Sequence, residues 1–124
     1  MSLVSFSQNK KIENFKITIL STMLSDIHVG EWGFSAMIEA DGKKILFDAG
    51  SRENTVLQNA RELNISLENI KDVFISHNHK DHTGGLLKIK ENYPNSFTDA
   101  HVGQGIFYSR PVSYTHLTLP TIVG

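Results

Sequence analysis

The chain has 124 residues, which is enough for one small domain. Hydrophobic residues make up 40% of it and charged residues 20%, and the formal net charge is −1. This near-neutral balance counts against nucleic acid or an anionic membrane as a partner. Since the chain has no cysteine, disulfides and thiolate ligands are excluded, and any transition metal must be held by histidine and carboxylate side chains.

The N-terminal segment, residues 1–8 (MSLVSFSQ), is mildly apolar but lacks a full hydrophobic region. Two interpretations stay open: a remnant of a secretory signal peptide, or a plain chain terminus. No apolar stretch has the length of a bilayer span, so we expect no membrane partner. We expect a cytoplasmic location by default, and export if residues 1–8 come from a signal peptide. The oligomeric state stays open.

The first half of the chain predicts three strands. Residues 15–19 alternate apolar with polar side chains, which is typical of a half-buried strand. Two further apolar runs, 34–40 and 44–47, flank Asp41-Gly42. Because both of these residue types tolerate positive φ, the pair predicts a tight hairpin turn.

The second half predicts two helices around another strand. Ser51 is expected to cap a helix whose apolar residues recur at helical spacing between 56 and 63. A strand over 70–76 follows, then a helix that begins near residue 86 and ends before Pro94. The glycine-rich segment 101–105 predicts a turn or a short helix. The order of elements indicates a mixed α and β class.

The most informative stretch is HNHKDH, residues 77–82, directly after the apolar strand. Its imidazoles and carboxylate are side chains that bind first-row metal ions. Residues two apart in an extended segment project to the same side, so His77 and His79 can converge on one ion. After a bend, Asp81 and His82 can reach a second ion. The pattern predicts a metal site at the carboxyl end of a strand, with hydrolysis as its chemistry.

Zinc is the usual ion for such imidazole ligands, and two ions can share a bridging hydroxide that is nucleophilic at neutral pH. Iron or manganese accept the same nitrogen and oxygen ligands, so the metal identity stays open. The alternative is a polar surface loop that happens to hold three histidines. The strand before the cluster and Gly84-Gly85 after it favour the metal site, since glycines let the backbone pass close to it.

Residues 76–86 (SHNHKDHTGGL) resemble the signature of the metallo-β-lactamase superfamily. Residues 38–50 (IEADGKKILFDAG) resemble its first motif, with Ala49 where members typically have threonine. The resemblance implies an α+β fold, namely the N-terminal half of a four-layer αββα sandwich, truncated so that one face of its sheet stays uncovered. Residues 31–35 (EWGFS) are similar to a loop of the dihydropterin–aminobenzene ribofuranosyl phosphate synthase-like branch. Trp32 there either overhangs the substrate pocket or is buried.

The resemblance also implies roles for single residues. His77 and His79 would bind the first ion, and Asp81 and His82 the second. Asp81 would also act catalytically, by holding or deprotonating the attacking water. Asp48 would brace the metal loop through hydrogen bonds without binding an ion.

The later ligands of the superfamily, two histidines and a bridging aspartate, have no counterpart in the chain. Each ion would therefore have two protein ligands from the motif, short of the three expected of a catalytic zinc. His28 and His101 are interpreted as incidental.

The segment 112–121 (VSYTHLTLPT) resembles the conceptual translation of a transposase-based sequencing adapter. We therefore expect residues 1–111 to be the N-terminal portion of a metallo-β-lactamase-like domain and 112–124 to be a non-native tail, in which His116 is accidental. The alternative is a genuine short strand.

The expected function is that of a metal-dependent hydrolase, whose metal-bound hydroxide attacks an ester, lactam, lactone, thioester or phosphoester in a small-molecule substrate. The chain itself is expected to be an incomplete and weakly active fragment. One alternative is a non-catalytic metal-binding or interaction fragment that dimerises through its uncovered face. Another is a nucleic-acid processing nuclease of the same superfamily, although the net charge leads us to expect no nucleic acid.

Overall fold

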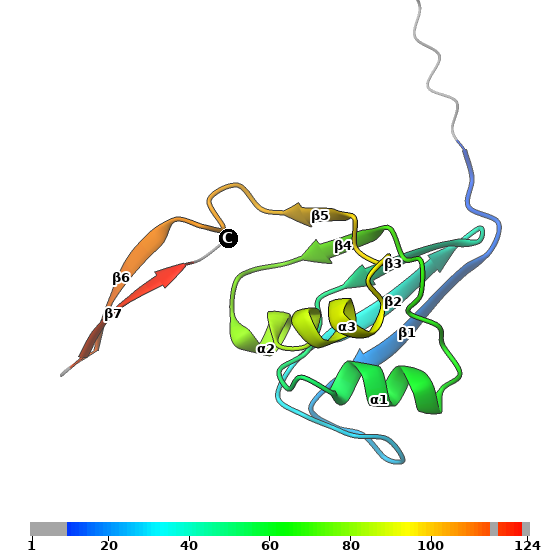
Figure 1. Cartoon of the computed structure of the whole chain (residues 1–124), viewed down its shortest axis with the longest axis horizontal. Coiled ribbons are helices and arrows are strands. Elements are labelled where there is room, and N and C mark those ends of the chain that lie inside the picture. Colours follow the sequence, from blue (N-terminus) through cyan, green and yellow to red (C-terminus); the bar gives the residue numbers. More distant parts are fainter. Residues whose placement is uncertain (1–9, 115–116, 123–124) are drawn as a thin grey trace, which may run out of the picture.

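The computed structural model describes residues 10–114 and 117–122 (Figure 1). Five strands form one mixed sheet in the order β1-β2-β3-β4-β5. They are β1 (Phe15–Ser21), β2 (Ser35–Ala40), β3 (Lys43–Phe47), β4 (Asp72–Ile75) and β5 (Asp99–Val102). The helices are α1 (Thr55–Glu62), α2 (Lys80–Thr83) and α3 (Leu86–Asn92). A separate two-stranded sheet contains β6 (Ser109–Tyr114) and β7 (Leu117–Ile122). The expected α+β class is confirmed.

The first part of the sheet is antiparallel, and its register follows from the predicted turn. Ala40 pairs with Lys43 across β2 and β3, which leaves Asp41 and Gly42 as the two turn residues. Their φ values are 48° and 82°, which lie in the left-handed region. Type I′ hairpin turns require positive φ at both central residues. The hairpin predicted from Asp41-Gly42 is therefore confirmed.

The second part of the sheet is parallel, and this places the functional side chains. β3 pairs with β4 and β4 with β5 in parallel, with α1 in the first crossover and α2 and α3 in the second. The carboxyl ends of β3 and β4 consequently lie at one edge of the sheet. Asp48 follows β3 directly, and Ser76 and His77 follow β4 directly, so these three residues meet at this edge.

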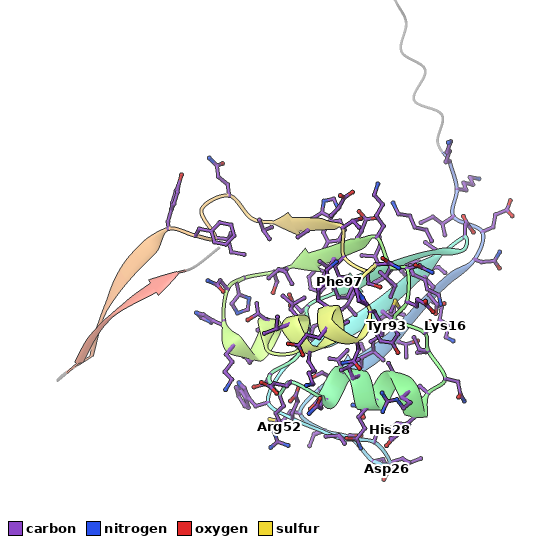
Figure 2. The ribbon with its side chains drawn as sticks, viewed as in Figure 1. Lys16, Asp26, His28, Arg52, Tyr93 and Phe97 are labelled. Carbon is purple, nitrogen blue, oxygen red and sulfur yellow. The ribbon has the colours of Figure 1, made fainter. Side chains whose placement is uncertain are left out.

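The core lies between one face of the sheet and the helices α1 and α3 (Figure 1). Paired residues of neighbouring strands share a face, and on this face Met37 pairs with Leu46, which pairs with Val73. The helices contribute buried apolar residues to the same cluster: Val56, Leu57, Ala60 and Ile89. Tyr93 and Phe97, after α3, pack against it while partly buried (Figure 2).

The other face of the sheet is apolar and open. Phe15, Ile17 and Ile19 of β1 are 59%, 52% and 45% exposed, whereas Leu20 is buried in the core. The alternation of β1 was predicted correctly. The sequence made no prediction of its buried side, because it does not say which face the helices cover. The exposed side chains agree with the expectation that one face of the sheet stays uncovered.

Two further details differ from the sequence-based expectations. α1 begins at Thr55 with Asn54 at the N-cap position, so the prediction that Ser51 caps it is wrong. His101 and Val102 belong to strand β5, so the turn predicted for 101–105 begins only after them, with Ile106 N donating to Gly103 O at 3.2 Å. His116 lies outside the described residues. Among the residues described, no helix has both the length and the apolar character that crossing a membrane requires.

The open face gives a test by substitution. We expect Ile17→Thr together with Ile19→Thr to lower the free energy of unfolding by less than about 1 kcal/mol, because both side chains are already half exposed and threonine suits a strand. Leu20→Ala, one position away in the core, should cost about 2–5 kcal/mol. Urea unfolding of the three proteins compares the values, and equal losses would contradict this assignment of the two faces.

Candidate metal centre

The metal-ligand candidates are brought together by a turn after β4. The chain leaves the sheet through Ser76 and His77, and α2 begins directly after His79. The backbone N–H groups of His82 and Thr83 donate to the His79 carbonyl at 3.0 and 3.1 Å. This single helical turn reverses the chain and brings Asp81 and His82 back to His77.

His77, Asp81 and His82 form a group of candidate ligands, each with one ligand atom within 4.8 Å of the others. His82 Nε2 lies 3.5 Å from Asp81 Oδ2, and the ring centroids of His77 and His82 are 4.0 Å apart. His79 is not in this group. Its exposed ring stands edge-on to His77, with 4.7 Å between the centroids. Three of the four predicted ligands thus converge, and the fourth lies beside them.

Asp48 lies beneath this group and is 1% exposed. Its Oδ1 accepts a hydrogen bond from the Ser76 backbone N–H at 2.8 Å, and its Oδ2 accepts from Ser76 Oγ at 2.6 Å. His82 Nδ1 lies 2.7 Å from the same Oδ2. Asp48 therefore contacts the cluster through hydrogen bonds, which is the arrangement that its predicted bracing role requires; the role itself stays a prediction.

His77 is held in the form that binds metals. Burial is the largest influence and lowers its pKa, and the neighbouring His82 and His79 lower it further, against the opposing effect of Asp48 and Asp81. A histidine with a lowered pKa is neutral at pH 7, and a metal ion binds the neutral imidazole.

A second buried carboxylate, Glu31, organises the loops around the cluster. It is 5% exposed and accepts hydrogen bonds from four groups. These donors are Ser21 Oγ at 2.7 Å, Ser51 N and Arg52 N at 2.8 Å each, and Thr55 Oγ1 at 2.9 Å. Glu31 thus ties the end of β1 to the loop between Asp48 and α1. Glu31 was not predicted to have this role, because a single glutamate in a loop carries no spacing pattern.

The loop after Asp48 and the segment after α2 lie backbone against backbone. Gly84 N donates to Gly50 O at 2.7 Å, and Gly85 N donates to Ala49 O at 2.9 Å. A Cβ on Gly84 would lie 1.9 Å from Ser51 O, which no side chain can satisfy. The two glycines thus permit a close backbone approach to the loop after Asp48, whereas the predicted approach was to the metal site itself.

A cavity of about 330 Å³ opens beside Asp81 and His82. Its other walls come from the loop between β1 and β2, and include Met23, Trp32 and Phe34. Trp32 is 72% exposed, so the alternative of a buried packing tryptophan is wrong.

The two remaining described histidines have partners elsewhere. His28 Nδ1 lies 2.8 Å from Glu62 Oε2 and connects the β1–β2 loop to α1 (Figure 2). His101 Nε2 lies 2.7 Å from Asp72 Oδ1, and its ring stacks on Phe74 with a centroid distance of 4.2 Å. Neither belongs to the candidate ligand group in the part of the chain that is described.

Comparison with known proteins assigns the fold to a family. The family model described as anti-Pycsar protein Apyc1 matches residues 15–101. The chain is 37% identical over 86 residues to 7,8-dihydropterin-6-methyl-4-(β-D-ribofuranosyl)-aminobenzene-5'-phosphate synthase of Methanocaldococcus jannaschii, covering 64% of this chain and 29% of that protein. It is 40% identical over 76 residues to ribonuclease Z of Borrelia duttonii, covering 61% and 23%.

Among solved structures, a metallo-β-lactamase from Novosphingobium pentaromativorans is similar with a TM-score of 0.41 and 19% identity, over 70% of this chain and 43% of that one. The resemblance to the metallo-β-lactamase superfamily, inferred from the motifs, is confirmed by the curated relatives. The chain spans less than a third of the length of these curated relatives. The expectation that no nucleic acid is involved is not supported, because one relative is a ribonuclease by name.

Glu31 gives a pH-dependent test. Burial, the largest influence, raises its pKa, but the hydrogen bonds from Ser51, Ser21, Arg52 and Thr55 together lower it below its ordinary value. A lowered folded pKa means that the carboxylate stabilises the fold above the unfolded pKa of about 4.3, and that this contribution is lost as the pH falls through the folded pKa.

We therefore expect Glu31→Gln to lower the free energy of unfolding at pH 7 by about 1.5–3 kcal/mol, the range for hydrogen bonds to a charged group. The difference from wild type should shrink below about pH 4, as the wild-type carboxyl becomes protonated. Denaturant unfolding at several pH values measures this difference in the free energy of unfolding. The control Glu53→Gln changes an exposed glutamate in the loop that Glu31 binds, between Asp48 and α1, and should have little effect. A loss for Glu31→Gln that does not change with pH would contradict this role.

Proposed function

The chain belongs to the family of anti-Pycsar protein Apyc1, and we propose that it forms the metal-binding part of a metal-dependent hydrolase. The observation that carries this proposal is the convergence of His77, Asp81 and His82, whose ligand atoms lie within 4.8 Å of one another. Neutral imidazoles with one carboxylate are the ligand set of zinc hydrolases, and iron or manganese would also accept them.

The charge and protonation state of the candidate ligands suit a divalent ion. His77 is neutral at pH 7 because its pKa is lowered, and Asp81 supplies a negative charge next to it. We propose that His77 and His79 hold one ion and that Asp81 and His82 hold a second. The 4.7 Å separation of the His77 and His79 rings supports a shared site for this pair.

The chemistry divides between the ions and the protein. When bound, the ions polarise the electrophile as Lewis acids and lower the pKa of an attacking water to about 7. Asp81 orients that water and accepts its proton, since its carboxylate lies among the ligands. Asp48 holds His82 in place through the 2.7 Å hydrogen bond to Nδ1. The cavity of about 330 Å³ beside Asp81 and His82, with Trp32 as a wall, receives the substrate.

We also propose that residues 1–111 are the N-terminal portion of the domain and that 112–124 are a non-native tail. The family match ends at residue 101, and the chain spans less than a third of its curated relatives, which supports a missing remainder. With two motif ligands for each ion, the 124-residue chain should bind zinc weakly and turn over little substrate.

Of the bonds considered, a phosphoester is the one that the relatives favour. Ribonuclease Z, 40% identical over 76 residues, cleaves RNA by its name, and RNA is joined by phosphodiesters. This relative also supports a second candidate function, that of a nuclease. The formal net charge of −1 does not favour it, because a nucleic-acid surface is usually basic.

Zinc titration tests the proposed ligands. Titration calorimetry of the purified chain should show weak zinc binding, and His77→Ala or Asp81→Ala should weaken it by at least about tenfold. The control His28→Ala removes a histidine that bonds to Glu62 on α1, and it should leave the affinity unchanged.

Unchanged zinc affinity in both ligand variants would overturn the proposed site. Tight binding of two zinc ions with rapid turnover would instead retain the site and contradict the proposal that the chain is incomplete.

The choice between the two candidate functions is tested with substrates. With zinc or manganese present, we expect slow hydrolysis of a chromogenic phosphodiester, and Asp81→Ala should abolish it. Cleavage of a labelled single-stranded RNA at a comparable or higher rate, falling steeply with salt, would favour the nuclease. If the zinc-bound protein hydrolyses neither substrate, the proposal that it acts on phosphoesters is wrong.

A further inference from the structure

Ser76 takes no part in the function proposed above, yet its hydroxyl lies between Asp48 and His77. Ser76 Oγ is 2.6 Å from Asp48 Oδ2 and 2.9 Å from His77 Nδ1. On the other side of the same carboxylate, His82 Nδ1 is 2.7 Å from Oδ2. Both imidazoles are therefore connected to one buried carboxylate, His82 directly and His77 through Ser76.

The number of protons in this chain of contacts fixes the direction of each hydrogen bond. An ionised carboxylate has only acceptor atoms, so the single proton of the Ser76 hydroxyl must point to Asp48. The Ser76 oxygen then offers only lone pairs to His77, and His77 Nδ1 must carry the hydrogen. His82 Nδ1, which faces Asp48 directly, must carry one as well.

We propose that Ser76 is a positioning residue that transmits the hydrogen-bonding requirement of Asp48 to His77, so that one buried carboxylate sets the same tautomer on His77 and His82. In both rings Nδ1 bears the proton and Nε2 keeps its lone pair. Both rings consequently present Nε2 as the ligand atom. The tautomer assignment concerns the metal-free chain, whereas its consequence for metal affinity rests on the proposed function.

Ser76→Ala tests the role of the hydroxyl alone. Ser76 also binds Asp48 Oδ1 through its backbone N–H at 2.8 Å, a bond that alanine retains. The substitution thus removes the hydroxyl and leaves the attachment of β4 to Asp48 in place. His82 Nδ1 keeps its 2.7 Å bond to Asp48, which is much shorter than its 3.5 Å contact with Ser76 Oγ, so His82 serves as an internal reference.

The first measurement is the ring ¹⁵N spectrum of the metal-free chain at about pH 8, where unperturbed imidazoles are neutral. In the wild type we expect both His77 and His82 to have the hydrogen on Nδ1. In Ser76→Ala, His77 should lose this preference while His82 retains it, and Ser76→Thr should restore His77. The control Thr83→Val removes a hydroxyl that bonds the His79 carbonyl, and it should change neither ring.

Two results would overturn the proposal: a wild-type His77 with its hydrogen on Nε2, or a Ser76→Ala spectrum identical to wild type. The wild-type spectrum decides the first point even if a variant does not fold. The second measurement is zinc affinity, which should fall about tenfold in Ser76→Ala and recover in Ser76→Thr. If the tautomers are as stated but no protein binds zinc, the proposed function fails and the tautomer assignment stands.

Discussion

The buried carboxylate of Asp48 is the group on which the arrangement of the metal-ligand candidates depends. Burying a charge is costly unless it is fully hydrogen-bonded, and Asp48 meets this condition with the Ser76 backbone, the Ser76 hydroxyl and His82. Its backbone is in the left-handed region, with φ of 54°, which is uncommon for a residue with a side chain. This conformation turns the chain at the end of β3, where the carboxylate reaches the residues that follow β4.

Glu31 is the second buried carboxylate that holds this region together, through hydrogen bonds to the loop that follows Asp48. Its carboxylate binds the loop that follows Asp48, and the segment after α2 packs on that loop through Gly84 and Gly85. Phe34 N also donates to the Asp81 carbonyl at 3.1 Å, which connects the β1–β2 loop to α2. Three loops that are distant in sequence are therefore held together by two buried carboxylates and by backbone hydrogen bonds. These hydrogen bonds hold the three loops in one arrangement, and with them the side chains of the candidate ligands.

The sequence predicted those features that depend on local patterns. Asp41-Gly42 encodes its own turn, and the spacing of the histidines after a buried strand predicted the region in which the candidate ligands converge. The role of Glu31 and the strand β5 were not predictable in the same way, because both depend on partners distant in the chain. Ser76 stood within the recognised motif, but only the distances to Asp48 and His77 show what its hydroxyl does. The exposed side of β1 was not predictable for a related reason: alternation defines two faces but does not tell which one the helices cover.

The hydrogen bonds that orient His77 and His82 are made entirely by the protein. Asp48, Ser76 and the turn of α2 hold the two rings with a centroid distance of 4.0 Å. A site that is ordered before the ion arrives loses little side-chain entropy on binding, so its affinity is set mainly by the number and charge of its ligands. In the described residues that number is limited by the motif itself, and the open apolar face of the sheet lies on the side away from α1 and α3. This part of the fold therefore contains two imidazoles, His77 and His82, that the protein holds by hydrogen bonds, together with an unfilled packing surface. For this reason we expect it to retain the geometry of the site more completely than its activity.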